Sequence, residues 1–252
     1  MRMHLPAILG VLIGLLKPAL AGEIKAPDYA EAFRKAFEPG WSIEVDDALV
    51  GEPPHLVKLS FRVNDLGRLK IVSGQICAAD PFVGLAAKPF LQSVPTGTFR
   101  VMLALISGAL GDGRVAFARV EFSEELVTSW RMAVTAGDDA SNLIPGEGLG
   151  YRVQSGIGSF FDPEAGKAAQ EAMKAESGLA DRWLGIGKEG GRGERGGHGF
   201  RLMADVGPSN LIAFDAGWGD GVYTSWFGFD ANGNVATLLT DFQSIDWTKA
   251  KL

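Results

Sequence analysis

The stretch that decides the fold is His-Leu-Val-Lys-Leu-Ser-Phe-Arg-Val at residues 55–63, in which apolar and polar side chains alternate. Successive side chains of an extended strand point to opposite faces, so this alternation predicts a strand with one buried face. Comparable segments follow at residues 69–78, 98–106, 114–122 and 129–135, separated by turn residues. Short strands at this spacing favour an antiparallel meander.

The second half of the chain returns to strands after a helix. Residues 136–150 are rich in Gly, Asp, Asn and Pro and mark a break, and a strand-like piece covers 151–161. A helix is predicted to follow to about Ala175, because Asp162 suits the N-cap and Pro163 the first helical position. Further strands are predicted at 211–215, 222–229 and 235–242, the last two joined by a hairpin turn.

Together with a short amphipathic helix predicted at residues 28–37, these patterns give the expected fold class. It is α+β and β-rich, with a mainly antiparallel, meander-like or sandwich-like sheet and one or two packed helices.

The first 21 residues have the pattern of a signal peptide. A basic start precedes an apolar run of 12 residues, Leu5–Leu16, and small residues at Ala19 and Ala21 suit cleavage after Ala21. The run is shorter than the roughly 20 residues that cross a bilayer, although an uncleaved anchor or a buried helix is the alternative. The prediction is a periplasmic or secreted protein that is soluble after cleavage.

Charge and length limit the partners and the number of domains expected of the mature chain. Cleavage removes Arg2 and Lys17 and no acid, so the net charge moves from -6 to -8, with 22 basic against 30 acidic residues. A negative surface disfavours nucleic acid and anionic membranes as partners. About 230 residues remain, enough for a single β-rich domain at 55–252 preceded by a helix and lead-in at 22–54.

No cofactor or metal is predicted. His55 and His198 are the histidines left after cleavage, and Cys77 is the single cysteine, so the usual zinc ligands are lacking. Residues 185–199 are glycine-rich and are expected to form a mobile loop.

The chain also contains an internal echo. Ser73-Gly74, five residues, Asp80-Pro81 and Gly84 are matched by Ser155-Gly156, five residues, Asp162-Pro163 and Gly166. The echo indicates either a duplicated strand-turn unit, in which each Asp caps a backbone turn, or a coincidence among common turn residues.

The densest group of chemically useful side chains is Asp215-Ala-Gly-Trp218-Gly-Asp220-Gly-Val-Tyr223, followed by Trp226. Its glycines allow a ligand to approach the backbone closely. Paired carboxylates beside aromatic rings suit acid/base chemistry on a sugar-like ligand. The alternative is a tight turn between two strands whose aromatic side chains belong to the core.

Several segments, taken in order, resemble a bacterial family known as domain of unknown function 4241 (DUF4241). They are Ser73–Pro81, Pro95–Phe99, Arg114–Val120, Tyr151–Gly158 and Gly217–Tyr223. In that family Asp, Thr and Cys usually stand where Gln154, Ile157 and Ser159 stand here, so any chemistry of those groups would be missing from this member. The family name implies no activity.

Three hypotheses about function follow. The first is a binding or interaction module for an unknown small molecule or protein, with its site at Trp218, Asp220, Tyr223 and Trp226, near the turns at Asp80 and Gly156, and with Asp162 as a further candidate. The second is a hydrolase that acts on a small polar or sugar-like substrate through Asp215 and Asp220, with Asp162 or a bound divalent ion as an optional third participant. The third is a purely structural exported domain.

Overall fold

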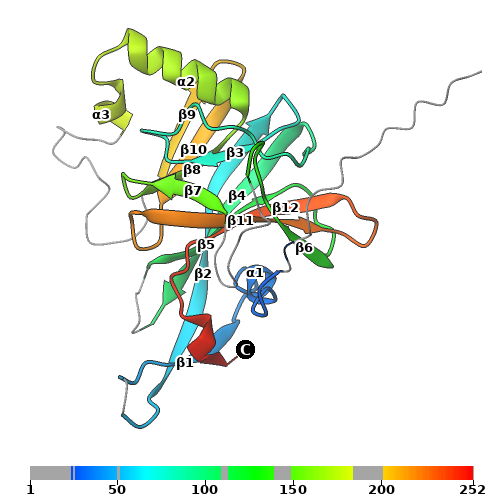
Figure 1. Cartoon of the computed structure of the whole chain (residues 1–252), viewed down its shortest axis with the longest axis vertical. Helices are drawn as coiled ribbons and strands as arrows, with labels where there is room; N and C mark the ends of the chain where they lie inside the picture. The colour runs from blue at the N-terminus through cyan, green and yellow to red at the C-terminus, as the bar shows by residue number, and fades with distance from the viewer. Residues whose placement is uncertain are drawn as a thin grey trace, which may run out of the picture.

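The computed structural model describes residues 24, 26–49, 52–108, 113–138, 149–183 and 201–251. The predicted signal peptide and the glycine-rich loop lie outside these residues. Two antiparallel sheets form the body of the protein, and α2 covers the smaller sheet (Figure 1). The expected β-rich α+β class is confirmed.

The larger sheet has the strand order β13-β1-β2-β4-β5-β12-β11-β6, and β7 also pairs with β11. The smaller sheet has the order β3-β8-β10-β9. The strands of the larger sheet are β1 (Ser42–Asp46), β2 (Leu56–Ile71), β4 (Gly97–Ser107), β5 (Val115–Glu121), β6 (Ser129–Met132), β7 (Gly150–Val153), β11 (Gly221–Phe229), β12 (Val235–Asp241) and β13 (Ala250–Lys251). Those of the smaller sheet are β3 (Cys77–Ala79), β8 (Ile157–Phe161), β9 (Arg201–Val206) and β10 (Ser209–Asp215). The helices are α1 (Ala32–Lys35), α2 (Pro163–Ala175), α3 (Leu179–Trp183) and the short 3-10 helix η2 (Trp247–Lys249).

Strand β2 is longer than the sequence predicted. The strand expected at 55–63 continues to Ile71, because a bulge between Asp65 and Gly67 lets the pairing with β4 go on. The strand expected at 69–78 is therefore divided between the end of β2 and the start of β3. The chain then turns at a corner before the short strand β3. Residues 42–46, expected in the lead-in, pair with the first part of β2 and belong to the same sheet.

Strand β1 pairs with only the first part of β2, so the second part of β2 has a free edge. Side chains of the smaller sheet form hydrogen bonds with this edge. The side-chain amide of Asn210 on β10 donates to the carbonyl of Arg68 at 2.8 Å and accepts from the N–H of Lys70 at 2.8 Å. Ser209 donates to the carbonyl of Lys70. These contacts satisfy strand-edge groups that would otherwise be buried without partners.

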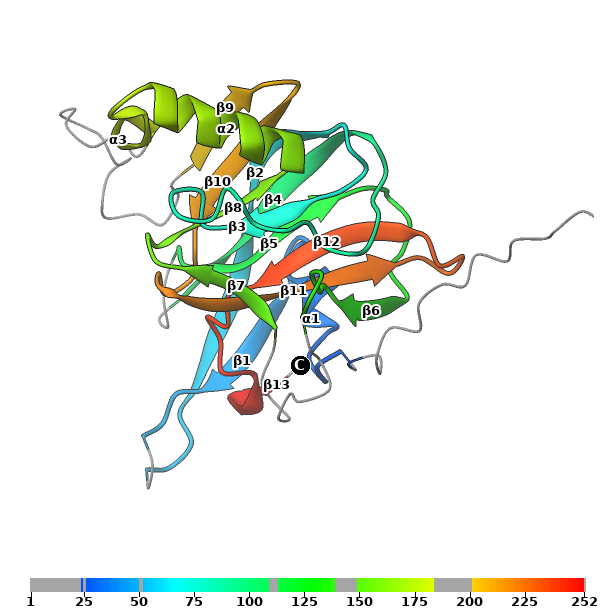
Figure 2. The same cartoon turned by 45° about the horizontal axis from the view of Figure 1, so that its top comes forward.

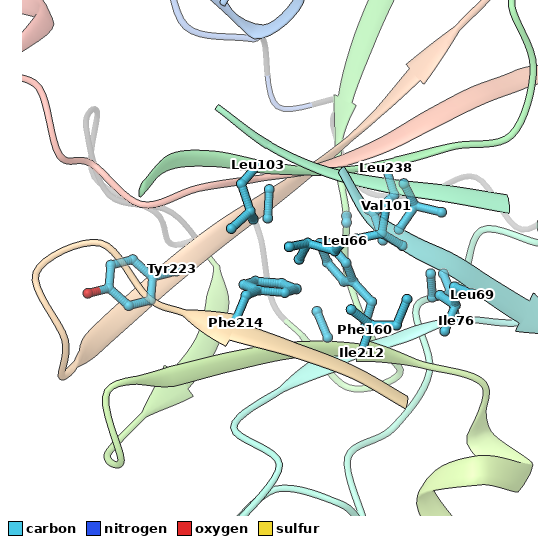
Figure 3. Close-up of a cluster of buried hydrophobic side chains, with 14 of the residues drawn as sticks. Leu66, Leu69, Ile76, Val101, Leu103, Phe160, Ile212, Phe214, Tyr223 and Leu238 are labelled. Atoms are coloured by element: carbon cyan, nitrogen blue, oxygen red, sulfur yellow. The ribbon is translucent and has the colours of Figure 1, made fainter. Parts of the chain in front are cut away.

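The main core lies between the two sheets. Figure 3 shows Phe160, Ile212 and Phe214 from the smaller sheet facing Leu66 and Leu103 from the larger. The alternation predicted for residues 98–106 holds, since Val101, Leu103 and Leu105 all enter this core. It is therefore the packing of one sheet on the other that buries the alternating face.

The opposite face of the larger sheet is also buried. Helix α1, the segment around it and the C-terminal segment cover this face (Figure 2). Phe33 of α1 is fully buried against Phe117 of β5, with ring centroids 5.4 Å apart. The predicted helix at 28–37 is shorter than expected, because the residues on either side of α1 form turns.

Two halves of the larger sheet repeat one another. Hairpins β4–β5 and β11–β12 each carry a register shift near the loop end, after Ala104 and after Gly228. Strands β5 and β12 pair with each other in a register that is symmetric about Arg119 and Leu239. An edge-to-face aromatic pair accompanies each hairpin, namely Phe99–Phe122 at 5.1 Å and Tyr223–Phe242 at 4.9 Å. The equivalent main-chain bonds are Phe122 N–H to Ala236 O and Phe242 N–H to Ala116 O. The sheet is thus built from two units related by an approximate two-fold axis between β5 and β12.

A buried carboxyl fixes the N-terminal segment to this sheet. Tyr29 stacks on Trp247 with ring centroids 5.0 Å apart and donates from its hydroxyl to Oδ2 of Asp241 at 2.9 Å. Burial of Asp241 raises the pKa of its carboxyl to about 6, against bonds from the N–H of Gln243 and from Tyr29 that act the other way.

This raised pKa predicts how stability depends on pH. The unfolded carboxyl has a pKa of about 3.9, so the folded state binds more protons between about pH 4 and pH 6. We expect the free energy of unfolding to fall by up to about 3 kcal/mol as the pH rises through this window. Chemical denaturation across pH 4–7 measures it, and Asp241→Asn should flatten the slope. A wild-type slope that persists in Asp241→Asn would contradict this assignment.

Candidate functional site

A tight glycine-rich turn connects β10 to β11. Gly217 and Gly219 both have positive φ, 37° and 100°, and the N–H of Gly219 donates to the carbonyl of Ala216 at 2.5 Å. A Cβ atom at position 217 would lie 2.6 Å from Cβ of Phe242. Glycine is therefore required at this position both for the backbone angle and for the close approach.

Trp218 projects from the turn into solvent, and Arg114 fixes its orientation. Its side chain is 60% exposed, and Cζ of Arg114 lies 3.5 Å from the centroid of the indole ring. The same guanidinium donates from Nη1 to the carbonyl of Gly217 at 2.9 Å. A cation stacked on an aromatic face is attracted to it, so one face of the indole is held while much of the ring stays open to solvent.

Tyr223 supports the turn from the side of the main core. Its ring packs at the edge of the main core, and its hydroxyl donates to the carbonyl of Gly219 at 2.9 Å (Figure 3). Burial raises the pKa of this phenol, and the nearby Asp220 carboxylate raises it further. Tyr223 thus holds the turn in place and contributes little exposed surface of its own.

The turn lies against the corner at Gly156. The N–H of Ala216 donates to the carbonyl of Gly156 at 3.0 Å, and a Cβ atom on Gly156 would be 3.8 Å from Cα of Gly219. Trp218, Asp220 and Tyr223 are therefore gathered at this corner.

Asp80 is a structural residue at the same corner. Its carboxylate is fully buried, and Oδ2 accepts from the N–H groups of Gln154 and Ser155 at 2.9 and 2.8 Å. Oδ1 accepts from the N–H of Phe82 at 2.9 Å. With both oxygens bonded to main-chain amides and no exposed surface, Asp80 has no access to a ligand.

Asp162 makes the reciprocal set of bonds. Its Oδ2 accepts from the N–H groups of Val72 and Ser73 at 2.7 and 2.8 Å and from the Ser73 hydroxyl at 2.9 Å. Its Oδ1 accepts from the N–H of Glu164 at 2.9 Å, which makes Asp162 the N-cap of α2 as predicted. Asp162 is also fully buried, so it belongs to the framework and not to a ligand surface.

These bonds decide between the two interpretations of the internal echo. Each Asp caps the corner of the other copy, and β3 and β8 pair with a register symmetric about Ala78 and Phe160. The glycines of the echo are equivalent too, since a Cβ would lie 2.9 Å from Ala79 Cβ at Gly84 and 2.6 Å from the Phe161 ring at Gly166. The echo is a duplicated structural unit.

Of the three remaining candidate residues, Asp220 lies on the turn, whereas Asp215 and Trp226 do not. Trp226 is 6% exposed and packs on the opposite face of the larger sheet, with its ring centroid 6.0 Å from that of Phe33. Asp220 is exposed on the turn, whereas Asp215 is half-buried at the end of β10, where it pairs with Ile157. Trp226 is therefore separated from Trp218 by the sheet itself.

Sequence reasoning missed Arg114. The residue follows a predicted turn and precedes a strand, a position typical of many surface arginines. Its indole partner lies more than 100 positions later in the chain, so no local pattern connects the two.

A family comparison matches residues 69–240 to the description "Protein of unknown function (DUF4241)". The chain belongs to this family. The DUF4241 match runs from the second part of β2 to the end of β12, so it covers both copies of the repeated unit and the Trp218 turn. No curated protein and no solved structure matches the chain.

The described residues of this DUF4241 member contain no group of three or more His, Cys, Asp or Glu side chains placed to hold a metal ion. None of the helices formed by the described residues has the length and apolar character needed to cross a membrane.

Proposed function

We propose that this protein is a binding module and that the turn at Trp218 is its ligand-binding surface. The observation that carries the proposal is the exposed indole of Trp218, held by Arg114 on a turn whose backbone is fixed by Gly217 and Tyr223. An exposed tryptophan on a rigid support loses little conformational freedom when a ligand stacks on it. Such rigid aromatic anchors contribute much of the energy in binding sites.

The chemistry of the turn supports a sugar-like ligand. A pyranose presents an apolar face that packs on an indole ring, and its hydroxyls form hydrogen bonds with carboxylates. Asp220 is exposed two residues from Trp218 and supplies such an acceptor.

The hydrolase alternative needs two carboxylates that act on one substrate from either side of the bond to be broken. Asp215 lies half-buried on a strand and Asp220 on an exposed turn. The exposed aromatic platform is explained by binding alone, so we favour the binding module.

We further propose that the protein works in the periplasm or outside the cell. The support is the sequence pattern of residues 1–21, with its basic start, apolar run and small residues before Gly22.

Replacement of the indole tests the binding surface. We expect Trp218→Ala to weaken binding of oligosaccharides about tenfold to a hundredfold, because stacking on an aromatic ring accounts for a few kcal/mol. Asp220→Asn should weaken it less. Titration calorimetry against a panel of neutral oligosaccharides measures both effects, with Trp41→Phe as the control, since Trp41 stacks on Phe61 away from the turn.

Failure of the whole panel to bind, or equal binding by wild type and Trp218→Ala, would contradict the proposal. Release of reducing ends that depends on Asp220 would favour the hydrolase.

Export is tested on the N-terminus of the processed protein. When the full chain is expressed in a Gram-negative host, mass spectrometry of the periplasmic fraction should give a protein that begins at Gly22. Recovery of the unprocessed chain from the cytoplasm would refute the prediction.

A further inference from the structure

A pocket lies on the face of the larger sheet that points away from the main core. It is bounded by α1, strands β5 and β12, and the segment that leads into β6. We call it the helix pocket. Its volume is about 220 Å³, smaller than the pockets of roughly 300 Å³ or more that hold drug-sized molecules. It shares no lining residue with the Trp218 turn. The helix pocket is therefore a separate site of a size that suits a small metabolite.

One wall of the helix pocket is aromatic. Phe33 and Phe37 of the helical segment and Trp130 of β6 line it, and the rings of Phe33 and Trp130 meet edge to face at 5.1 Å. The helical part of α1 is only four residues long, so it covers this end of the sheet incompletely. Phe33 is fully buried, so the apolar surface open to the side chain of a ligand comes from Trp130 and the edge of Phe37.

The floor of the helix pocket carries a largely buried arginine. The side chain of Arg119 on β5 is 16% exposed, and its Cζ lies 4.0 Å from the centroid of the Phe37 ring. Nη2 donates to Oε1 of Glu121 at 3.1 Å, whereas Nε is buried and has no hydrogen-bond partner among the described residues. Nε has no surface that a ligand oxygen could reach, so a ligand carboxylate would meet the guanidinium at the exposed part of the side chain, beside Glu121.

The mouth of the helix pocket is acidic. Glu124 and Glu125 line it from the exposed segment after β5. Glu38 also lines it and is paired with Arg34 on the same helical face. A carboxylate ligand alone would meet these like charges, whereas a ligand that also carries a cationic group would gain from them.

We propose that the helix pocket binds a free α-amino acid with an apolar or aromatic side chain. The ligand carboxylate accepts from the guanidinium of Arg119, the side chain packs against Trp130 and the exposed edge of Phe37, and the ammonium group faces Glu124 and Glu125. One small molecule thus matches the guanidinium, the aromatic wall and the acidic mouth together.

Titration calorimetry of the purified protein tests this assignment with four probes. L-phenylalanine and L-leucine should bind, whereas phenylacetate, which lacks the ammonium group, and phenethylamine, which lacks the carboxylate, should bind at least about tenfold more weakly. Arg119→Gln should weaken binding of L-phenylalanine about tenfold to a hundredfold, because a charge-assisted hydrogen bond is lost. Arg182→Gln is the matched control, since Arg182 of α3 pairs with Glu176 and does not line the pocket.

A second variant guards against a folding defect in Arg119→Gln. Leu126 is exposed and lines the mouth, so Leu126→Trp should block the helix pocket and abolish binding without disturbing the core. Trp218→Ala should bind L-phenylalanine as the wild type does. No binding of either amino acid at millimolar concentration would overturn the proposal. So would binding that survives Leu126→Trp, or phenylacetate binding as tightly as L-phenylalanine.

Discussion

The structure depends on two buried carboxylates that exchange partners between the copies of a repeated unit. Asp80 accepts two main-chain amides from the corner at Gln154 and Ser155, and Asp162 accepts two from the corner at Val72 and Ser73. A fully buried charge is tolerated only where its hydrogen-bond capacity is used, and here each carboxylate has three or four donors. Because each cap holds the corner of the other unit, neither unit can keep its corner if the other is lost.

The candidate binding turn depends on this framework. The corner held by Asp80 continues to Gly156, whose carbonyl fixes Ala216 at the start of the turn. Arg114, which orients the Trp218 ring, comes from the β4–β5 connection of the first unit, while Trp218 belongs to the second. The exposed indole is thus set by contacts between the two copies. The same two-fold arrangement places Arg119 near the centre of the sheet, beneath the short α1.

Strand alternation made most of the sheet predictable from the sequence. Residues 98–106 alternate because the two faces of the sheet meet different cores, and the Asp-Pro pair at 162–163 marks a helix start by its local hydrogen bonds. Strand β2 was divided in two because nothing in the sequence shows that a bulge at Gly67 lets a strand continue. The distant partners of Asp80 and Asp162 could not be predicted for a related reason. A carboxylate beside a turn has the same local pattern whether it binds a ligand or caps a corner about 75 to 90 residues away in the chain. Trp226 was wrongly grouped with Trp218. The face of the sheet to which a side chain points depends on the residue at which the turn ends and the strand begins.

The most direct test of the reciprocal caps is equilibrium unfolding of Asp80→Asn, Asp162→Asn and the double variant. An amide in place of either carboxylate sets an NH₂ group against main-chain N–H donors, so each single variant should lose about 2–4 kcal/mol in one cooperative transition. Asp230→Asn is the control, because Asp230 caps only its own hairpin turn and should lose less. Single variants as stable as the wild type, or separate unfolding of the two units, would contradict the account.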